Sequence, residues 1–240
     1  MALTLALVES ALQLVPEQIQ THPQIKEYAK RRRKSPEEVL LDRGLHNAAM
    51  QRLARTRYKL PVERMGRPDI VHSTLLQVLE TPLNWEGQLR TLVHTQEDLV
   101  ISIDPKVRLP KNYVRFVGLI EQLFAEGQVP KNGKPLLRLE KMPLHRLVDR
   151  LAPSKVLALT TLGKPKLLRE VVQYASGFKD PMILVGGFPR GHFTEGTRKL
   201  GSETFKVDKQ SLDAWVVAGR FVYDFEWAIG LGQNRLEQSE

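Results

Sequence analysis

Residues 181–193, PMILVGGFPRGHF, decide the fold. The apolar run at residues 182–185 is too short for a helix and predicts a buried strand. The strand ends at two glycines, and the loop that follows has the spacing G-G-x-x-x-G rather than the G-x-G-x-x-G of dinucleotide-binding folds. Glycine lets a backbone approach a ligand closely. The loop is therefore either one wall of a ligand pocket or a plain turn after a strand, and the glycines alone favour neither.

Length and charge set the first limits on function. The 240 residues allow one large domain or two small ones, and 42% hydrophobic residues suffice for a sizeable core. The 36 lysines and arginines exceed the 27 acids, giving a net charge of +9 that favours an anionic partner, with nucleic acid first. A generally basic cell interior would give the same balance. The absence of cysteine excludes disulfides, thiolate metal sites and cysteine nucleophiles.

The start of the chain does not resemble a targeting signal. Residues 2–8 are apolar but lack a basic leader, and Glu9 follows too early for a signal peptide. No run approaches the roughly 18 apolar residues of a membrane span. We therefore expect a soluble, cytoplasmic protein with no membrane partner.

The pattern of apolar residues predicts an α/β fold with a mostly parallel sheet flanked by helices. Strands are expected at residues 3–7, 89–94, 98–103, 136–139, 155–159, 182–185 and 204–207, the second and third as a hairpin. Helices are expected at residues 70–81, 113–126, 144–151, 164–175 and from about 211 onward. Residues 129–135, VPKNGKP, are the most linker-like stretch.

A basic segment around residues 22–62 contains the run KRRRK at residues 30–34. Such a run is either a solvated loop or an arm that contacts phosphates. Ser35 is followed by a proline and two acids, which predicts an N-cap and a helix continuing to about residue 55.

Three loops follow the carboxyl ends of predicted strands, at residues 160–163, 186–191 and 207–212. Ligands of open α/β sheets bind at such ends, so the three loops together favour a pocket more than the glycines alone. The histidines show no metal-ligand spacing, and neither G-x-S-x-G nor a Walker A motif occurs. We expect no metal, and group transfer to a nucleic acid from a bound cofactor.

Two further motifs carry positive charge. Arg108 lies in a proline-framed loop, and Lys111 and Arg115 are four residues apart, which predicts a shared helix face beside a helix N-terminus that favours phosphate. A solvated basic face is an equally good explanation. In MGRPDI, spacing alone favours Asp69 as the N-cap of a helix beginning at Ile70, with Arg67 as a solvated loop residue.

Four stretches resemble one known family: GRPDIVHSTLLQVLETPLN at residues 66–84, LVHT at 92–95, VRLPKNYVRFVGLIEQL at 107–123 and LVGGFPRGHF at 184–193. They resemble the small-subunit ribosomal RNA pseudouridine N1-methyltransferases, ribosome biogenesis enzymes of archaea and eukaryotes in the SPOUT class. The resemblance covers nearly the whole chain. It implies one SPOUT-class domain over residues 1–240, with the basic segment 22–62 added, and a C-terminal trefoil knot, a rare exception to normal chain topology.

The resemblance also implies S-adenosylmethionine as methyl donor, a homodimer, and small-subunit rRNA in a pre-ribosomal particle as partner. The implied cofactor contacts come from the three loops and are Thr160, Thr161, Gly186, Gly191, Val207, Asp208, Lys209, Gln210, Ser211 and Leu212.

The implied RNA contacts are Arg67, Arg108, Lys111 and Arg115, with Asp69 orienting Arg67. Lys111 stands where eukaryotic members have arginine, so planar bidentate phosphate binding is lost there. The expected reaction is methylation at N1, which only C-linked pseudouridine leaves free, and whether a side chain acts as general base stays open. The alternatives are a non-catalytic rRNA-binding assembly factor and a knotted methyltransferase that acts on tRNA.

Overall fold

Strand β1 (Leu3–Ser10) lies in the middle of the sheet and is buried along its whole length. The computed structural model describes residues 2–56 and 58–237. Leu3, Leu5 and Leu7 pack into one hydrophobic cluster, whereas Ala6 and Val8 pack into a second cluster on the opposite face. The alternation of a strand therefore supplies both faces of the sheet with core residues, as expected from the sequence.

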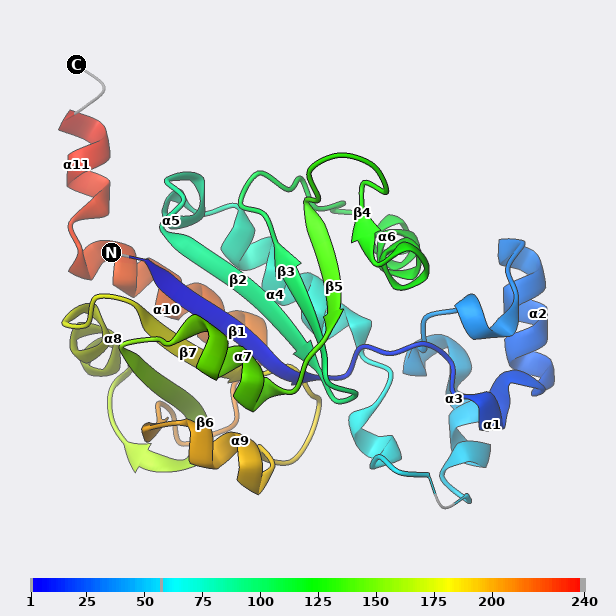
Figure 1. Ribbon diagram of the computed structural model, residues 1–240. Coiled ribbons are helices and arrows are strands. Elements are labelled where there is room, and N and C mark those ends of the chain that lie inside the picture. Colours follow the sequence, from blue (N-terminus) through cyan, green and yellow to red (C-terminus); the bar gives the residue numbers. More distant parts are fainter. Residues whose placement is uncertain (1, 57, 238–240) are drawn as a thin grey trace.

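Eight strands form one sheet in the described residues, in the order β4-β5-β3-β2-β1-β7-β6-β8 (Figure 1). The other strands are β2 (Leu89–Thr95), β3 (Leu99–Ile103), β4 (Gln128–Val129), β5 (Leu137–Lys141), β6 (Lys155–Pro165), β7 (Pro181–Gly186) and β8 (Glu203–Lys206).

The sheet has a parallel half and an antiparallel half. Strands β2, β1, β7, β6 and β8 pair in parallel, and β2, β3, β5 and β4 pair antiparallel. The predicted hairpin at residues 89–103 is confirmed. The strand expected at 136–139 exists as β5 but is antiparallel. The stretch 129–135 is not a linker, because Val129 ends β4 and residues 130–136 form the turn between β4 and β5.

Strand β6 contains a bulge that folds around β8. Phe205 of β8 pairs with Leu159 before the bulge and again with Lys164 after it. A side chain at Gly163 would place its Cβ 2.4–2.6 Å from backbone atoms of Phe205, so only glycine fits there. The residues expected as a free loop at 160–163 are thus part of this bulge.

Helices cover both faces of the sheet (Figure 1). Helices α4 (Pro68–Leu79), α6 (Tyr113–Glu126), α8 (Leu168–Ser176) and α10 (Ala214–Ala228) pack into one cluster with Leu3, Leu5 and Leu7. Helix α7 (Leu144–Leu151) and the end of α9 (Glu195–Leu200) pack on the other face. Helix α8 begins later than the predicted residue 164, because residues 164 and 165 still pair with β8. Short helices α5 (Pro82–Trp85) and α11 (Leu231–Glu237) complete this part of the chain.

The N-terminal segment, seen on the right of Figure 1, has a small core of its own. It consists of α1 (Glu17–Gln20), α2 (Pro23–Arg32), the 3-10 turn η1 (Pro36–Glu38), α3 (Arg43–Leu53) and the 3-10 turn η2 (Val62–Arg64). The single helix predicted from Ser35 to residue 55 is wrong. The capping box of Ser35 and Glu38 forms, but the chain turns extended at Val39 and Leu40 bridges to Leu14.

None of the helices in residues 2–56 and 58–237 combines the length and the apolar character needed to cross a membrane.

Candidate functional site

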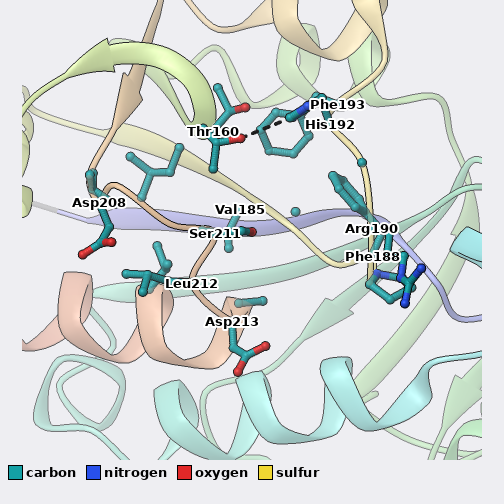
Figure 2. Close-up of a pocket in the computed structure, with 18 of the residues that line it drawn as sticks. Thr160, Val185, Phe188, Arg190, His192, Phe193, Asp208, Ser211, Leu212 and Asp213 are labelled. Atoms are coloured by element: carbon teal, nitrogen blue, oxygen red, sulfur yellow. Dashed lines mark hydrogen bonds between the residues drawn. The ribbon is translucent and has the colours of Figure 1, made fainter.

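A cavity of about 320 Å³ opens at the carboxyl ends of the parallel strands (Figure 2). It is lined by the β6 bulge, by the glycine loop (residues 187–194, between β7 and α9) and by the segment between β8 and α10. The structure brings together all the predicted cofactor residues except Lys209: Thr160, Thr161, Gly186, Gly191, Val207, Asp208, Gln210, Ser211 and Leu212.

The first wall is the β6 bulge. Thr160 Oγ1 accepts a hydrogen bond from the Leu162 backbone N–H at 3.4 Å. Thr161 Oγ1 and His192 Nδ1 are 3.3 Å apart, and this hydrogen bond is dashed in Figure 2. It connects the β6 bulge to the glycine loop on one side of the cavity.

The second wall is the glycine loop, and two of its glycines are required by geometry. The Gly187 N–H donates to the Val8 carbonyl at 2.8 Å, and a Cβ on Gly187 would lie 2.2 Å from Ser10 Oγ. Gly191 has φ +87°, a left-handed conformation that disfavours other residues. The loop is therefore pressed against the carboxyl end of β1, and it is not a plain turn.

The third wall runs from β8 to α10. The Gln210 N–H donates to Asp208 Oδ1 at 2.9 Å, which closes a tight turn. Helix α10 begins at Ala214, three residues after the predicted start, and its N-cap residue Asp213 makes no side-chain cap hydrogen bond. Figure 2 shows the Asp213 carboxylate at the edge of the cavity.

Sequence reasoning missed several lining residues: Phe188, Arg190, His192, Phe193, Lys206 and Asp213. Each lies within or directly beside a predicted loop, so loop membership was the available signal. The charges of the whole cavity lining are mixed in sign, with two carboxylates, Asp208 and Asp213, among two arginines and a lysine.

Arg67 lines this cavity and is held by Asp69. Its Nε donates to Asp69 Oδ1 at 2.8 Å and its terminal nitrogen to Oδ2 at 2.7 Å, a bidentate pair. Asp69 lies in the first turn of α4, whose N-cap is Arg67, so the cap role predicted from spacing is wrong. The hydrogen bond to Asp69, followed by the charges of Asp69 and Asp213, raises the pKa of Arg67.

Arg67 also lines a second, mostly apolar groove of about 450 Å³. The groove is formed by side chains of α2, α3, α4 and α6: Tyr28, Leu45, Asp69, Tyr113, Val114 and Val117. Arg67 therefore stands where the cavity and the groove adjoin.

The basic patch lies outside the cavity. Arg108, Lys111 and Arg115 are exposed, and in the part of the chain that the structure describes none of the three forms an ion pair. Lys111 precedes the N-cap Asn112, so it does not share a helix face with Arg115 as predicted. His72 Nε2 lies 2.8 Å from the Pro110 carbonyl, which ties the loop of Arg108 to α4, the helix that also presents Arg67.

Two cations of the basic run at residues 30–34 form ion pairs inside the protein. Lys30, Arg31 and Arg32 form the last turn of α2. Arg32 and Lys34 both pair with the buried carboxylate of Glu121 on α6, at 2.8 and 2.9 Å. For these two cations neither the solvated loop nor the phosphate-contacting arm is correct.

No group of three or more acidic or histidine side chains in the described residues is arranged to hold a metal ion.

The chain matches the EMG1/NEP1 methyltransferase family over residues 5–226. It belongs to this family. It is 43% identical to the ribosomal RNA small subunit methyltransferase Nep1 of Thermococcus kodakarensis over 230 residues, covering 95% of this chain and 100% of the relative. It is 40% identical to Nep1 of Pyrococcus furiosus over 227 residues, covering 95% and 97%. The chain is therefore a methyltransferase, as expected, and not a non-catalytic assembly factor.

The fold agrees with a solved relative. The crystal structure of Archaeoglobus fulgidus Nep1 bound to S-adenosylhomocysteine superposes with a TM-score of 0.82 at 30% identity, covering 96% of this chain and 100% of that one. The cavity described above has the size of ordinary small-molecule sites, roughly 300–1,000 Å³. Apolar side chains of Leu159, Val185 and Leu212 fit an adenine ring, and the mixed charges fit a ligand with a carboxylate, an ammonium and a sulfonium. The residues present therefore fit S-adenosylmethionine, the methyl donor of the family.

Proposed function

We propose that this protein methylates N1 of a pseudouridine in small-subunit rRNA and so takes part in small-subunit assembly. One observation carries the proposal: Arg67, fixed by Asp69, lines the same cavity as the three predicted cofactor segments. It can therefore touch a nucleotide whose reacting atom lies at the cofactor. The small-subunit rRNA named for the Nep1 relatives supports the choice of substrate.

S-adenosylmethionine, when bound, supplies an activated methyl group on its sulfonium. Thr160, Thr161, Gly186, Gly191 and the residues 207–212 would hold it, with Lys209 outside the cavity lining. The task of the protein is to bring N1 into line with that methyl group, and orientation can account for much of the rate. Arg67 serves this task, since its bidentate pair leaves the guanidinium one fixed orientation.

Asp69 acts as an orienting residue. Both of its carboxylate oxygens accept hydrogen bonds from Arg67, and it does not line the cofactor cavity. A carboxylate so engaged is poorly placed to take the N1 proton. The proton then leaves to solvent or to another group at the cavity.

The RNA must present the target base unstacked, as enzymes that modify bases require. Arg108, Lys111 and Arg115 are exposed and lie beside the N-terminus of α6, so they are free to bind the phosphates that flank the target. Only pseudouridine offers a free N1, because N1 of uridine is bonded to ribose. Methylation would therefore follow an isomerisation of uridine in the same RNA.

We also propose that the chain has the trefoil knot of the SPOUT class. Support comes from the β6 bulge, which pairs with Phe205 on both of its sides and leaves no room for a side chain at Gly163. An experimental structure in which the chain after residue 205 could be withdrawn without crossing an earlier segment would overturn this topology.

A homodimer is proposed on an exposed apolar face of α10. Val216, Tyr223 and Trp227 are 36%, 58% and 76% exposed and lie on one side of the helix. Light scattering should give about twice the protomer mass of 27.4 kDa, and Trp227→Asp should halve it. A wild-type mass of one protomer would contradict the dimer. The pre-ribosomal particle as partner and a cytoplasmic location belong to the same proposal.

The test uses two synthetic RNA hairpins that differ only in pseudouridine or uridine at the target position. Radiolabel from S-adenosylmethionine should enter the pseudouridine hairpin alone, and mass spectrometry should locate the methyl group on N1. Equal transfer to both hairpins would overturn the N1 assignment. A parallel reaction with tRNA examines the tRNA methyltransferase alternative, which predicts label in tRNA and none in rRNA.

A further inference from the structure

Glu9 occupies an unusual position at the end of β1. It is 5% exposed, and its φ of +51° places a residue other than glycine in the left-handed region. Such a conformation is uncommon and is kept only where surrounding contacts fix it. The site residues predicted from the sequence do not include Glu9, and it does not line the cofactor cavity.

The contacts of Glu9 fix the far end of the glycine loop. Glu9 Oε1 accepts hydrogen bonds from the Thr194 backbone N–H at 2.8 Å and from Thr194 Oγ1 at 2.7 Å. Thr194 is also the N-cap of α9 and accepts a hydrogen bond from the Thr197 N–H at 3.3 Å. The point at which the loop ends and α9 begins is thus bound to a single carboxylate.

The near end of the loop is fixed by the neighbours of Glu9. The Gly187 N–H donates to the Val8 carbonyl at 2.8 Å, and the Ala11 N–H donates to the Gly187 carbonyl at 2.9 Å. Both ends of the loop, Gly187 and Thr194, are therefore anchored on the four residues 8–11. The conformation of Glu9 determines where the second anchor stands relative to the first.

Arg64 connects this anchor to Phe188 at the start of the loop. Its guanidinium pairs with Glu9 Oε2 at 2.6 Å and lies 4.0 Å from the centroid of the Phe188 ring. The two side chains of the ion pair are only 14% and 6% exposed. Phe188 lines the cofactor cavity and packs edge-on against Phe193 at 5.7 Å. One buried carboxylate thus reaches the start of the loop through Arg64 and its end through Thr194.

We propose that Glu9 is a positioning residue that sets the shape of the cofactor loop through Thr194 and Arg64. The inference rests on the proposed cofactor site and concerns how that site is held. Backbone groups of the loop have to stand within a few tenths of an ångström of their ligand-binding positions, and hydrogen bonds behind the loop keep them there. Glu9 acts on S-adenosylmethionine binding and leaves RNA binding unchanged, because its side chain bonds to Thr194 and Arg64 and, in the described residues, to none of the four RNA-facing cations.

The experiment measures S-adenosylhomocysteine binding by calorimetry, together with KM for S-adenosylmethionine and for RNA. Glu9→Gln keeps the shape but removes the charge, and Thr194→Val removes one hydroxyl. Each should raise the Kd and the cofactor KM on the order of tenfold, since a small misplacement can cost that much, with the RNA KM unchanged. Thr194→Ser restores the hydroxyl and should bind like the wild type.

Glu121→Gln is the matched control. Glu121 is also a buried carboxylate paired with an arginine, at 2.8 Å, but it lies away from the cofactor cavity. It should lower thermal stability while leaving the Kd unchanged. Should Glu9→Gln fail to fold, Thr194→Val against Thr194→Ser decides the question.

The outcomes separate the two levels of the proposal. If the wild type does not bind S-adenosylhomocysteine, the cofactor site itself is wrong and the role of Glu9 goes with it. If the wild type binds and folded Glu9→Gln and Thr194→Val bind equally well, the positioning role is overturned and the cofactor site stands. An equal loss of affinity in Glu121→Gln would also overturn it, because the effect would then be one of general stability.

Discussion

Glu9 and Glu121 are two buried glutamates with similar partners and different consequences. Each pairs with an arginine and accepts a backbone N–H, from Thr194 in one case and from Leu40 in the other. Glu121 joins α6 to the N-terminal segment through Arg32 and Lys34. Glu9 instead joins the end of β1 to a loop that lines the cofactor cavity.

The difference lies in the position of each group within the sheet and not in its chemistry. Glu9 lies at the carboxyl end of a parallel strand, where ligands of open sheets bind, and Glu121 lies on a covering helix. A buried ion pair by itself is weak evidence for function or for net stability. Its place in the topology indicates which of the two it serves, and substitutions can separate the two roles.

The largest expected effect is the loss of stability in Glu9→Ala. This change leaves Arg64, a buried cation, without its partner, which should reduce the free energy of unfolding by about 3–5 kcal/mol. Glu121→Ala should cost less, about 1–3 kcal/mol, because Arg32 and Lys34 are 22% and 26% exposed and can reach water. Urea unfolding of both variants measures the order, and a larger loss in Glu121→Ala would contradict it.

A third carboxylate, that of Asp69, should affect activity rather than stability. Asp69 is 44% exposed, so Asp69→Asn should change stability little while loosening Arg67. We expect kcat/KM for the RNA to fall about tenfold, with the S-adenosylmethionine KM unchanged. Steady-state kinetics at varied RNA and varied cofactor distinguishes these effects. A rise in the KM for S-adenosylmethionine alone would contradict this role, because Asp69 would then act on the cofactor and not on the RNA.

The two groups of cations should respond differently to salt. Lys111→Ala and Arg115→Ala together should weaken RNA binding about tenfold. The slope of log K against log salt concentration should become shallower by roughly 0.7 for each phosphate that the variant no longer neutralises. Arg31→Ala, in the basic run beside Glu121, should leave both quantities unchanged, because Arg31 is paired with Glu27 on the same helix. Filter binding at several salt concentrations provides the comparison. An equal effect of Arg31→Ala would contradict this and would show that the basic run at residues 30–34 contacts RNA.

The smallest effect concerns pH and the N-terminal segment. Burial lowers the pKa of His46, whose Nδ1 accepts a hydrogen bond from the Asp42 N–H at 3.1 Å. The folded state therefore favours the neutral ring. The stability that the neutral His46 ring contributes is complete above the pKa of histidine in the unfolded chain, about 6.5. It is lost as the pH falls below that value. Urea unfolding at pH 7.5 and 5.5 should show a smaller decrease for His46→Gln than for the wild type, and equal decreases would contradict this.

Much of the fold could be predicted because it depends on local patterns. The apolar runs of β1 and β7, the hairpin of β2 and β3, and the stop of α6 at Gly127 each follow from a few neighbouring residues. The helix predicted from Ser35 to residue 55 fails because Leu40 is needed in a bridge to Leu14, a tertiary demand that overrides helical spacing.

The candidate site was predicted unevenly for the same reason. Its loops follow strand ends and could be located, and nine of the ten cofactor residues implied by the family resemblance line the cavity. The cap assigned to Asp69 and the helix face assigned to Lys111 were wrong, because both depend on where a helix begins, to within one residue. The hydrogen bonds between Glu9 and Thr194 join residues 185 positions apart, so no local sequence pattern could predict them.

A crystal structure of the protein with S-adenosylhomocysteine tests the central claim most directly. We expect the ligand between the β6 bulge, the glycine loop and residues 207–212, with both Thr194–Glu9 hydrogen bonds and the Arg64–Phe188 contact retained. A ligand bound elsewhere on the chain would contradict the cofactor site. A ligand in this cavity with Thr194 released from Glu9 would contradict the anchoring of the loop.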